Sequence, residues 1–500
     1  MTAMTVDSLP ASADDAPATP RAPEAGAPQR SPFTLLLTVA PYIVLLGTFG
    51  FLVKRAAKTI TNNDTYFHLR FGEEFLHGGW SLQHPGSVTT FGTNDWVPTQ
   101  WLPQVVMAQM EDWFGLAGVA WLAGSLFILL AVTLWFVARR YAGPIPAVAV
   151  VVVALLAASP GLSMRPQVVS YVFVALTTAA WFRTSHDGKV RWWLVPLTWV
   201  WATAHGMWPI GLVIGAVALV GIALDRVVPR RIWLRHLLVL VLSAAATALT
   251  PVGPKLWSAV LLVNSRGTYF SEWQPAHFTK PYAVAFLVLA CALLLRMMRR
   301  TTPASWTEAL LVLLAGGWAL YTARTVMVAA VMLVPFAAKA VQELARRRVA
   351  VSRREVGVVL AGAALSLVTL ALVVPQTADE PPPDADWYAE LDALPAGTVV
   401  LNDWTKGGYL MWRFPGLDLV SNGYGDIFTD QELERNFRMD ATQPGWLRYV
   451  RQTGAEYALL APGSYLEAEL MDIADWRLVH RGDFVDLLVP PDDWPDSAPG

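Results

Sequence analysis

The sequence has little cysteine and little charge. Its 500 residues include one cysteine, Cys291, which excludes an intrachain disulfide and a metal site built from several thiolates. Only 15% of the residues are charged, whereas soluble proteins average about 25%. The net charge of −2 provides no global field for nucleic acid, so we expect no nucleic-acid partner. Apolar residues dominate instead, at 54% of the chain with a mean hydropathy of +0.41.

Long apolar runs recur along most of the chain and predict a mainly α, polytopic membrane protein with about 11 membrane helices. Most runs approach the ~20 residues that cross a bilayer. The break around Pro196 and Pro209 leaves ten or twelve spans as alternatives. The expected spans are residues 33–53, 115–138, 144–161, 167–183, 192–204, 208–224, 235–250, 281–296, 306–322, 325–343 and 356–375.

Lysine and arginine predict the orientation of these spans. They concentrate in alternate loops, around residues 139–140, 189–191, 226–235, 296–300 and 346–354. The positive-inside rule makes these loops and the N-terminus cytoplasmic, against the smaller opposing cluster of Lys54, Arg55 and Lys58. With eleven spans the C-terminus is extracytoplasmic, so we expect a multi-pass plasma-membrane protein.

Composition divides the chain into four parts. Residues 1–32 lack periodicity and predict a disordered cytoplasmic tail. Residues 33–375 form the expected membrane domain, and its first apolar run is too long for a signal-peptide core. An acidic, proline-rich linker at 376–386 leads to an extracytoplasmic α/β domain at 387–500. The strand-like runs of that domain are 398–403, 417–420, 457–462, 476–482 and 484–490, with helices expected near 431–437 and 444–454.

The long outer loops, 54–102 and 251–280, carry the polar residues, above all in NDTYFHLRFGEEFL at 63–76. This stretch predicts a short helix capped by Asn63 or Asp64. Asp64 and His68 are four residues apart and share one helix face. The pair can bind a divalent cation such as Mg²⁺ or Mn²⁺, or Asp64 can act as general base while His68 orients it or binds phosphate. In the structural alternative, Asp64 is only an N-cap and His68 a satisfied interfacial side chain.

Four more polar residues lie at expected outer helix ends or loops. Arg165 in SMRPQ and Arg324 in YTARTV can clamp a phosphate or simply snorkel to the interface. His205 in WATAHGMWP follows a helix break, which at membrane depth is tolerated around protein or a water-filled cavity. Glu272 in SEWQP can be a second acid, a metal ligand or a loop anchor.

In their order and spacing these motifs resemble the outer segments of bacterial polytopic membrane proteins with the GT-C glycosyltransferase fold. The resemblance runs from about residue 33 to about residue 490. It rests on NDTYFHLRFGEEFLHGG with WVPTQWLPQVVMAQMEDWFGLAGVAWL, then MRPQVVSYVF, WVWATAHGMWPIGL, SEWQP and NDWTKGGYLMWRFPGLDLVSNGYGD.

The resemblance implies a donor sugar on a polyprenyl phosphate, transferred at the outer face of the membrane to an envelope glycan, lipid or protein. It implies that Asp64 deprotonates the acceptor hydroxyl and that Glu272 supports the acceptor or a metal. It implies that His68, Arg165 and Arg324 hold the departing lipid phosphate. Arg70 and His205 are the other residues expected to bind the substrate or its phosphate. An anionic leaving group needs cations near it, and positive charge on the sugar ring needs carboxylates.

Some positions depart from the family pattern. Asn62 stands at its first acidic position, Gln100 where glutamate is common, and Thr203 where asparagine is common. Asn422-Gly423-Tyr424 replaces a common Asp-Gly-Arg. A metal-free site and one that draws on Glu272 therefore both remain open.

Two other classes of function also stay open. One is a non-catalytic scaffold, and the other is a flippase or transporter for a lipid-linked substrate. The expected spans have no Asp or Glu in their central parts, which favours chemistry at the surface over coupled transport.

Overall fold

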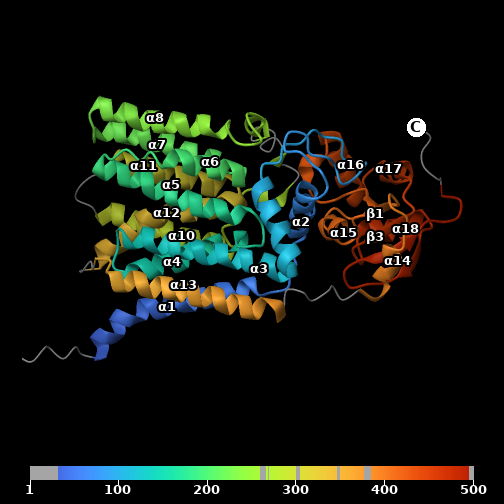
Figure 1. The fold of residues 1–500 in the computed structure, drawn as a ribbon, viewed down its shortest axis with the longest axis horizontal. Coiled ribbons are helices and arrows are strands. Elements are labelled where there is room, and N and C mark those ends of the chain that lie inside the picture. Colours follow the sequence, from blue (N-terminus) through green and yellow to red (C-terminus); the bar gives the residue numbers. More distant parts are fainter. Residues whose placement is uncertain are drawn as a thin grey trace, which may run out of the picture.

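The structure is a computed structural model that describes residues 32–259, 266–267, 270–299, 304–345, 350–376 and 385–494. The predicted tail, apart from Pro32, and residues 377–384 of the predicted linker lie outside the described residues. The described chain forms a helical bundle, followed by a smaller part that contains a sheet (Figure 1).

A helix occupies every range that was predicted to span the membrane, and Figure 1 shows these helices running side by side. They are α1 (Pro32–Ala56), α3 (Trp101–Arg139), α4 (Pro144–Ala158), α5 (Gln167–Asp187), α6 (Leu194–Ala204), α7 (Pro209–Asp225), α8 (Arg230–Thr247), α10 (Pro281–Arg299), α11 (Trp306–Tyr321), α12 (Ala323–Leu344) and α13 (Arg353–Val373). Six described helices are long and apolar enough to cross a membrane: α1, α3, α4, α10, α12 and α13. The protein is therefore a membrane protein, while the count of eleven spans stays a prediction.

Helix α12 is the centre of the bundle. Within its apolar window 83% of the residues are buried inside the protein, against 22% for α13 at the periphery. Its alanine-rich sequence lets neighbouring helices approach closely, and α4, α5, α10 and α11 all contact it. Arg324 is the second residue of α12, so the packing of this central helix in the bundle fixes its position.

The residues after α13 build a five-stranded sheet with the strand order β2-β1-β3-β5-β4. Strands β1, β2 and β3 are parallel, whereas β5 is antiparallel to both β3 and β4. All five predicted strands are confirmed as β1 (Val399–Asn402), β2 (Asp418–Leu419), β3 (Tyr457–Leu460), β4 (Arg477–His480) and β5 (Asp486–Val489). The accompanying helices are α14 (Tyr388–Asp392), α15 (Gly407–Arg413), α16 (Asp430–Asp440), α17 (Trp446–Thr453) and α18 (Tyr465–Ile473), of which α16 and α17 were predicted.

Helix α2 (Asn63–Leu76) lies between the bundle and the sheet (Figure 1). On the bundle side, a Cβ atom at Gly72 would clash with the backbone of Gln104 in α3, so only glycine permits this close approach. On the sheet side, the rings of Tyr66 and Tyr409 meet edge to face with centroids 5.0 Å apart. The C-terminal part therefore holds α2 down on the bundle.

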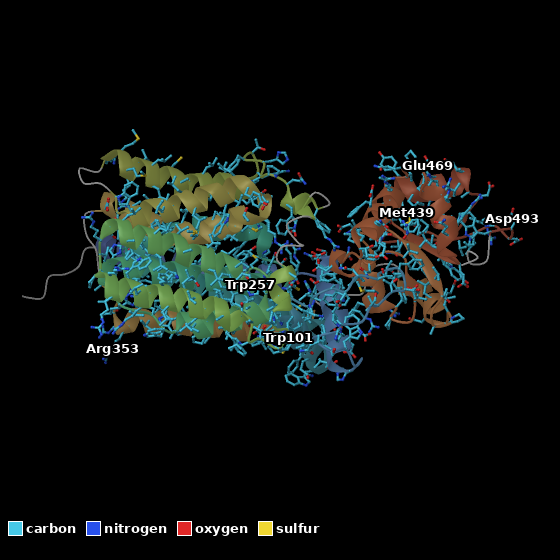
Figure 2. The ribbon with its side chains drawn as sticks, turned by 90° about the horizontal axis from the view of Figure 1, so that it is seen from above. Trp101, Trp257, Arg353, Met439, Glu469 and Asp493 are labelled. Carbon is cyan, nitrogen blue, oxygen red and sulfur yellow. The ribbon has the colours of Figure 1, made fainter. Side chains whose placement is uncertain are left out.

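The opposite end of the bundle contains buried ion pairs. Figure 2 shows Arg353, at the start of α13, at the end of the bundle farthest from Asp493 near the end of the chain. Close to Arg353 in sequence, Glu355 accepts hydrogen bonds of 2.5 and 2.7 Å from Arg139, and both side chains are almost fully buried. Glu355 therefore neutralises a buried arginine at a helix end.

We expect the variant Glu355→Ala to destabilise the protein by about 3 kcal/mol, because it leaves the buried Arg139 without its counter-charge. Thermal unfolding in detergent measures the change. Glu434→Ala is the matched control, since Glu434 and its partner Arg438 are both about half exposed and the variant should unfold close to wild type. Equal unfolding of both variants would show that the Arg139–Glu355 pair contributes little.

Candidate active site

Helix α2 carries Asp64 and His68, and its N-cap is Asn62. The Asn62 side chain accepts a 2.9 Å hydrogen bond from the backbone N–H of Asp64. The prediction of Asn63 or Asp64 as the cap is wrong, because Asn62 has the extended backbone of a capping residue while Asp64 already lies in the first turn. The carboxylate of Asp64 is thus available for other contacts.

Arg165 supplies the principal contact to Asp64. It lies in the turn between the 3₁₀ helix η1 (Ser159–Gly161) and α5, and its guanidinium donates to the Asp64 carboxylate through Nη1. Its Nε donates to Ser163 Oγ at 3.1 Å, which orients the side chain. The two predicted site residues are therefore in direct contact, although 101 positions separate them.

Arg55 fixes the turn that presents Arg165. Its guanidinium donates to the carbonyl oxygens of Ser159 at 2.8 Å and Leu162 at 2.7 Å. These carbonyls follow the end of α4, and that of Ser159 also accepts from the backbone N–H of Leu162 at 3.2 Å. This local role explains why a basic residue lies on the predicted outer side.

Glu272 and Arg324 complete a line of alternating charges. Arg324 Nη1 lies 2.5 Å from Glu272 Oε1, and Arg165 Nη2 lies 3.6 Å from Glu272 Oε2. The guanidinium of Arg324 also lies over the ring of Trp273, 5.4 Å from its centroid. Two guanidiniums thus balance two carboxylates, and all four side chains keep partial access to solvent.

His68 and His205 lie buried beside this charge line. The amide nitrogen of Gln104 donates to His68 Nδ1 at 3.0 Å, which leaves the His68 proton on Nε2. Burial lowers the pKa of His68 well below its usual value, and Arg165, His205 and Arg324 lower it further. His68 is therefore neutral and can offer phosphate a hydrogen bond but no positive charge.

His205 presents a second imidazole. Its Nδ1 accepts from the backbone N–H of Met207 at 3.2 Å. Its Nε2 is buried and has no hydrogen-bond partner among the residues that the structure describes. Such an orphaned donor is rare unless a ligand completes it.

Arg70 does not join this cluster. It pairs with Glu74 one turn along α2, at 2.6 Å. Six of the seven predicted site residues, all except Arg70, are linked by contacts or by their mutual electrostatic influence.

The C-terminal part adds a carboxylate that the sequence did not single out. Asp426 accepts a 2.6 Å hydrogen bond at its backbone carbonyl from Asn94 of the predicted outer loop 54–102. Burial raises the pKa of Asp426, and Arg266 and Arg324 counteract that rise. Nearby Tyr424 packs against Phe67 of α2, with ring centroids 4.9 Å apart. Asp426 had no local signal in the sequence, because only the docking of the C-terminal part on the predicted outer loops brings it near Arg324.

The surroundings of Asp64 shift the pKa of its carboxyl group. Burial raises its pKa, Arg165 lowers it, and Glu272 raises it again. The net effect is a pKa above the usual value for aspartate. A carboxylate with a raised pKa is a stronger base than an ordinary aspartate at the same distance from a proton.

An apolar cavity of about 230 Å³ adjoins the charge line. Helices α3, α5 and α6 supply most of its wall, which includes Leu122, Phe173 and Val200. Arg165 is the one charged side chain among the described residues that line it. The cavity therefore joins an apolar surface to a cation.

No family model and no curated protein match the chain. Solved structures do. ArnT from Cupriavidus metallidurans, bound to undecaprenyl phosphate, aligns over 93% of this chain and 100% of its own, with a TM-score of 0.52 and 14% identity. Its apo form gives a TM-score of 0.53. The archaeal oligosaccharyltransferase AglB from Archaeoglobus fulgidus, with an inhibitory peptide and a dolichol-phosphate, aligns over 88% of this chain and 70% of its own, with a TM-score of 0.53 and 12% identity.

The chain has the GT-C glycosyltransferase fold. The fold expected from the order of the outer motifs is thereby confirmed. At identities of 12–14% the similarity establishes the fold, and the reaction has to be argued from the site.

The positions that depart from the GT-C pattern have structural roles here or lie outside the charge line. Asn62 caps α2, as described above. The hydroxyl of Thr203 donates to the carbonyl of Trp199 within α6, at 2.8 Å. Gln100 precedes α3 and makes no side-chain capping bond.

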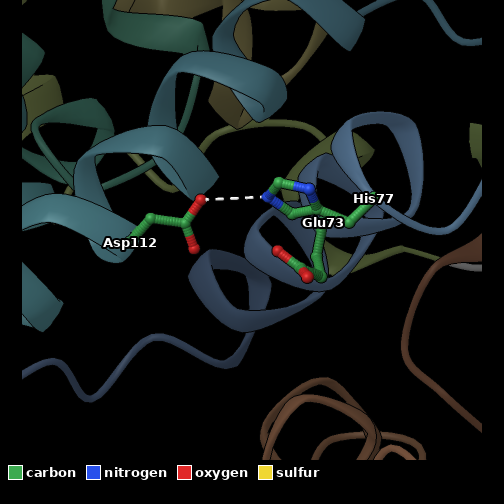
Figure 3. Close-up of side chains that lie close together, drawn as sticks. All are labelled: Glu73, His77 and Asp112. Atoms are coloured by element: carbon green, nitrogen blue, oxygen red, sulfur yellow. Dashed lines mark hydrogen bonds and ion pairs between the residues drawn. The ribbon is translucent and has the colours of Figure 1, made fainter.

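In this GT-C structure the predicted metal ligands Asp64 and His68 have protein partners, Arg165 and Gln104. Among the described residues, the group of three side chains that could hold a metal ion lies at the other end of α2 and consists of Glu73, His77 and Asp112 (Figure 3). A divalent cation held by Asp64 stays a prediction.

Proposed function

We propose that the chain is a membrane glycosyltransferase, which transfers a sugar from a polyprenyl-phosphate donor to a hydroxyl of an envelope glycan, lipid or protein on the extracytoplasmic face. One observation carries the proposal: Arg165 both lines the apolar cavity and pairs with Asp64. A molecule with an isoprenoid tail, a phosphate and a sugar requires this junction of apolar wall, cation and carboxylate.

The donor would enter with its tail against the apolar wall and its phosphate at Arg165 and Arg324. In the free protein these guanidiniums pair with Asp64 and Glu272. An incoming phosphate competes for the same guanidiniums, since bidentate contacts to phosphate are strong. Binding of the donor would therefore release the carboxylate of Asp64 for chemistry. Among proteins with this fold, ArnT has been solved with undecaprenyl phosphate and AglB with a dolichol-phosphate.

In the proposed step, Asp64 takes the proton of the acceptor hydroxyl. The acceptor oxygen forms a bond to the anomeric carbon while the bond from that carbon to the phosphate oxygen breaks. The electron pair leaves with the polyprenyl phosphate, whose negative charge Arg165 and Arg324 stabilise. His205 Nε2, together with the neutral His68, would donate hydrogen bonds to the donor. Asp426, on which Arg324 acts electrostatically, would contact the acceptor from the side of the C-terminal part.

The raised pKa of Asp64 gives the reaction an expected pH dependence. The base works as a carboxylate, so kcat/KM should rise with pH. The midpoint of this rise, the acid limb of the profile, should lie above the usual aspartate pKa of about 4. Glu272 raises the pKa of Asp64, so Glu272→Gln should move this limb to lower pH even if it also lowers the maximal rate. The measurement is kcat/KM against pH for wild type and variant.

Glu434→Gln is the matched control, because its carboxylate lies on α16 and is 50% exposed. Its acid limb should coincide with that of wild type. A limb that moves to higher pH in Glu272→Gln would contradict the assignment of Asp64 as the base.

The proposed function is tested with purified protein in nanodiscs, a panel of radiolabelled polyprenyl-phosphate sugars and an envelope extract as the acceptor. We expect one donor to bind saturably and its label to appear in the acceptor fraction. If the folded protein binds no donor, the transferase proposal is wrong and a scaffold is favoured. If it binds a donor without transferring the sugar and, in sealed proteoliposomes, moves the donor across the bilayer, a flippase is favoured.

A further inference from the structure

Three side chains with metal-binding chemistry meet at the end of α2 that lies away from Asp64. Glu73 and His77 lie four residues apart on α2, and Asp112 comes from α3. Figure 3 shows the three side chains turned toward one another, with His77 Nε2 3.2 Å from Asp112 Oδ2. All three ligand atoms lie within 4.8 Å of one another. The i, i+4 spacing places two of them on one face of α2, and α3 presents the third opposite.

The charge around this group is unbalanced. Among the described residues, no lysine or arginine forms an ion pair with Glu73 or Asp112. The nearest arginine along α2, Arg70, is paired with Glu74. The other polar contact to Asp112 comes from the neutral amide of Gln109, at 3.4 Å. Two carboxylates and an imidazole at this separation would be stabilised by a divalent cation.

The donor set selects the kind of cation. Mg²⁺ and Ca²⁺ prefer oxygen ligands throughout, whereas one imidazole nitrogen with two carboxylate oxygens suits Zn²⁺. Zinc–ligand bonds of about 2.0–2.2 Å separate neighbouring ligand atoms by roughly 3.3 Å. The three ligand atoms need to approach one another only slightly to reach this separation. The side chains of His77 and Asp112 are exposed enough to rotate.

We propose that Glu73, His77 and Asp112 form a Zn²⁺ site that fastens the C-terminal end of α2 to α3. Water would complete the coordination at this exposed position. The site holds the far end of the helix whose first turns carry Asp64 and His68. It adjoins the kink of α3 at Gly115, where the helix departs from regular backbone angles. The bound ion would limit movement of α2 relative to the bundle, whatever reaction the protein performs.

Metal binding is measured directly on the full chain in nanodiscs, after treatment with a chelator. Zn²⁺ is titrated in competition with a chromophoric chelator, and X-ray absorption reports the ligand atoms. We expect one tightly bound Zn²⁺ per chain, with one imidazole and oxygen ligands, that excess Mg²⁺ does not displace. His77→Ala and Asp112→Asn should each weaken Zn²⁺ binding by more than about 100-fold, because even outer-shell changes cost 10–100-fold.

His84→Ala is the matched control, since His84 is an exposed histidine of the same outer loop and contacts Ser81. Its affinity for Zn²⁺ should equal that of wild type. Circular dichroism and thermal unfolding verify that each variant is folded. The proposal is overturned if wild type binds no Zn²⁺, or if His77→Ala binds it as tightly as wild type does. Neither result depends on donor binding or transfer, so the proposed function is tested separately.

Discussion

Replacing Asp64 with asparagine should lower the rate of label transfer by about 10²–10⁴-fold, the usual contribution of a general base. Asparagine keeps the shape of the side chain and still accepts a hydrogen bond from Arg165, but its amide cannot take the proton of the acceptor. Donor binding should be unchanged or tighter, because the variant removes a negative charge beside the phosphate. Single-turnover transfer and donor binding, measured on the same nanodisc preparation, separate the two effects.

Asp95→Asn is the control for this variant. Asp95 lies in the same predicted outer loop, its carboxylate is 74% exposed, and its ion-pair partner is Lys255 at 3.8 Å. Transfer by Asp95→Asn should match wild type. If Asp64→Asn transfers label at the wild-type rate, Asp64 is not the base and Glu272 is the next candidate. If it loses donor binding as well as transfer, Asp64 positions the donor instead.

The charge line could be predicted from the sequence because topology brings its members together. Asp64, Arg165 and Arg324 are far apart along the chain, yet each flanks an apolar run on the same predicted side of the membrane. Helices that cross the bundle in alternate directions must place these ends on one face. The residue types then indicated phosphate chemistry, and the structure brings six of the seven predicted residues together.

What the sequence could not predict depends on contacts between distant segments. Helix α15 begins with two glycines that favour a loop, but Gly408 packs against the backbone of Asn63, where a larger side chain would clash. Asp426 gains its place near Arg324 only through that docking. Arg55 lies on the predicted outer side, against the positive-inside rule, and it binds two carbonyl groups there. A count of charges along the sequence cannot reveal this role.

Replacing Arg165 with glutamine should weaken binding of the polyprenyl-phosphate donor by about 10–100-fold, since a hydrogen bond to a charged group contributes about 1.5–3 kcal/mol. The variant also leaves Asp64 and Glu272 with less opposing charge, and their carboxylates then repel the phosphate. Donor binding to nanodiscs measures the effect. Arg183→Gln is the matched control, because Arg183 lies on α5 with its side chain 51% exposed and should not affect the donor.

A second ligand separates the two roles of Arg165, phosphate binding and cavity wall. A polyprenol of the same length has the tail but no phosphate, so its weaker binding should be the same in wild type and Arg165→Gln. Selective loss of the phosphorylated lipid would place the phosphate at Arg165. Equal loss of both lipids would mean that Arg165 shapes the apolar cavity and that the phosphate binds elsewhere, with Arg324 as the remaining arginine of the charge line.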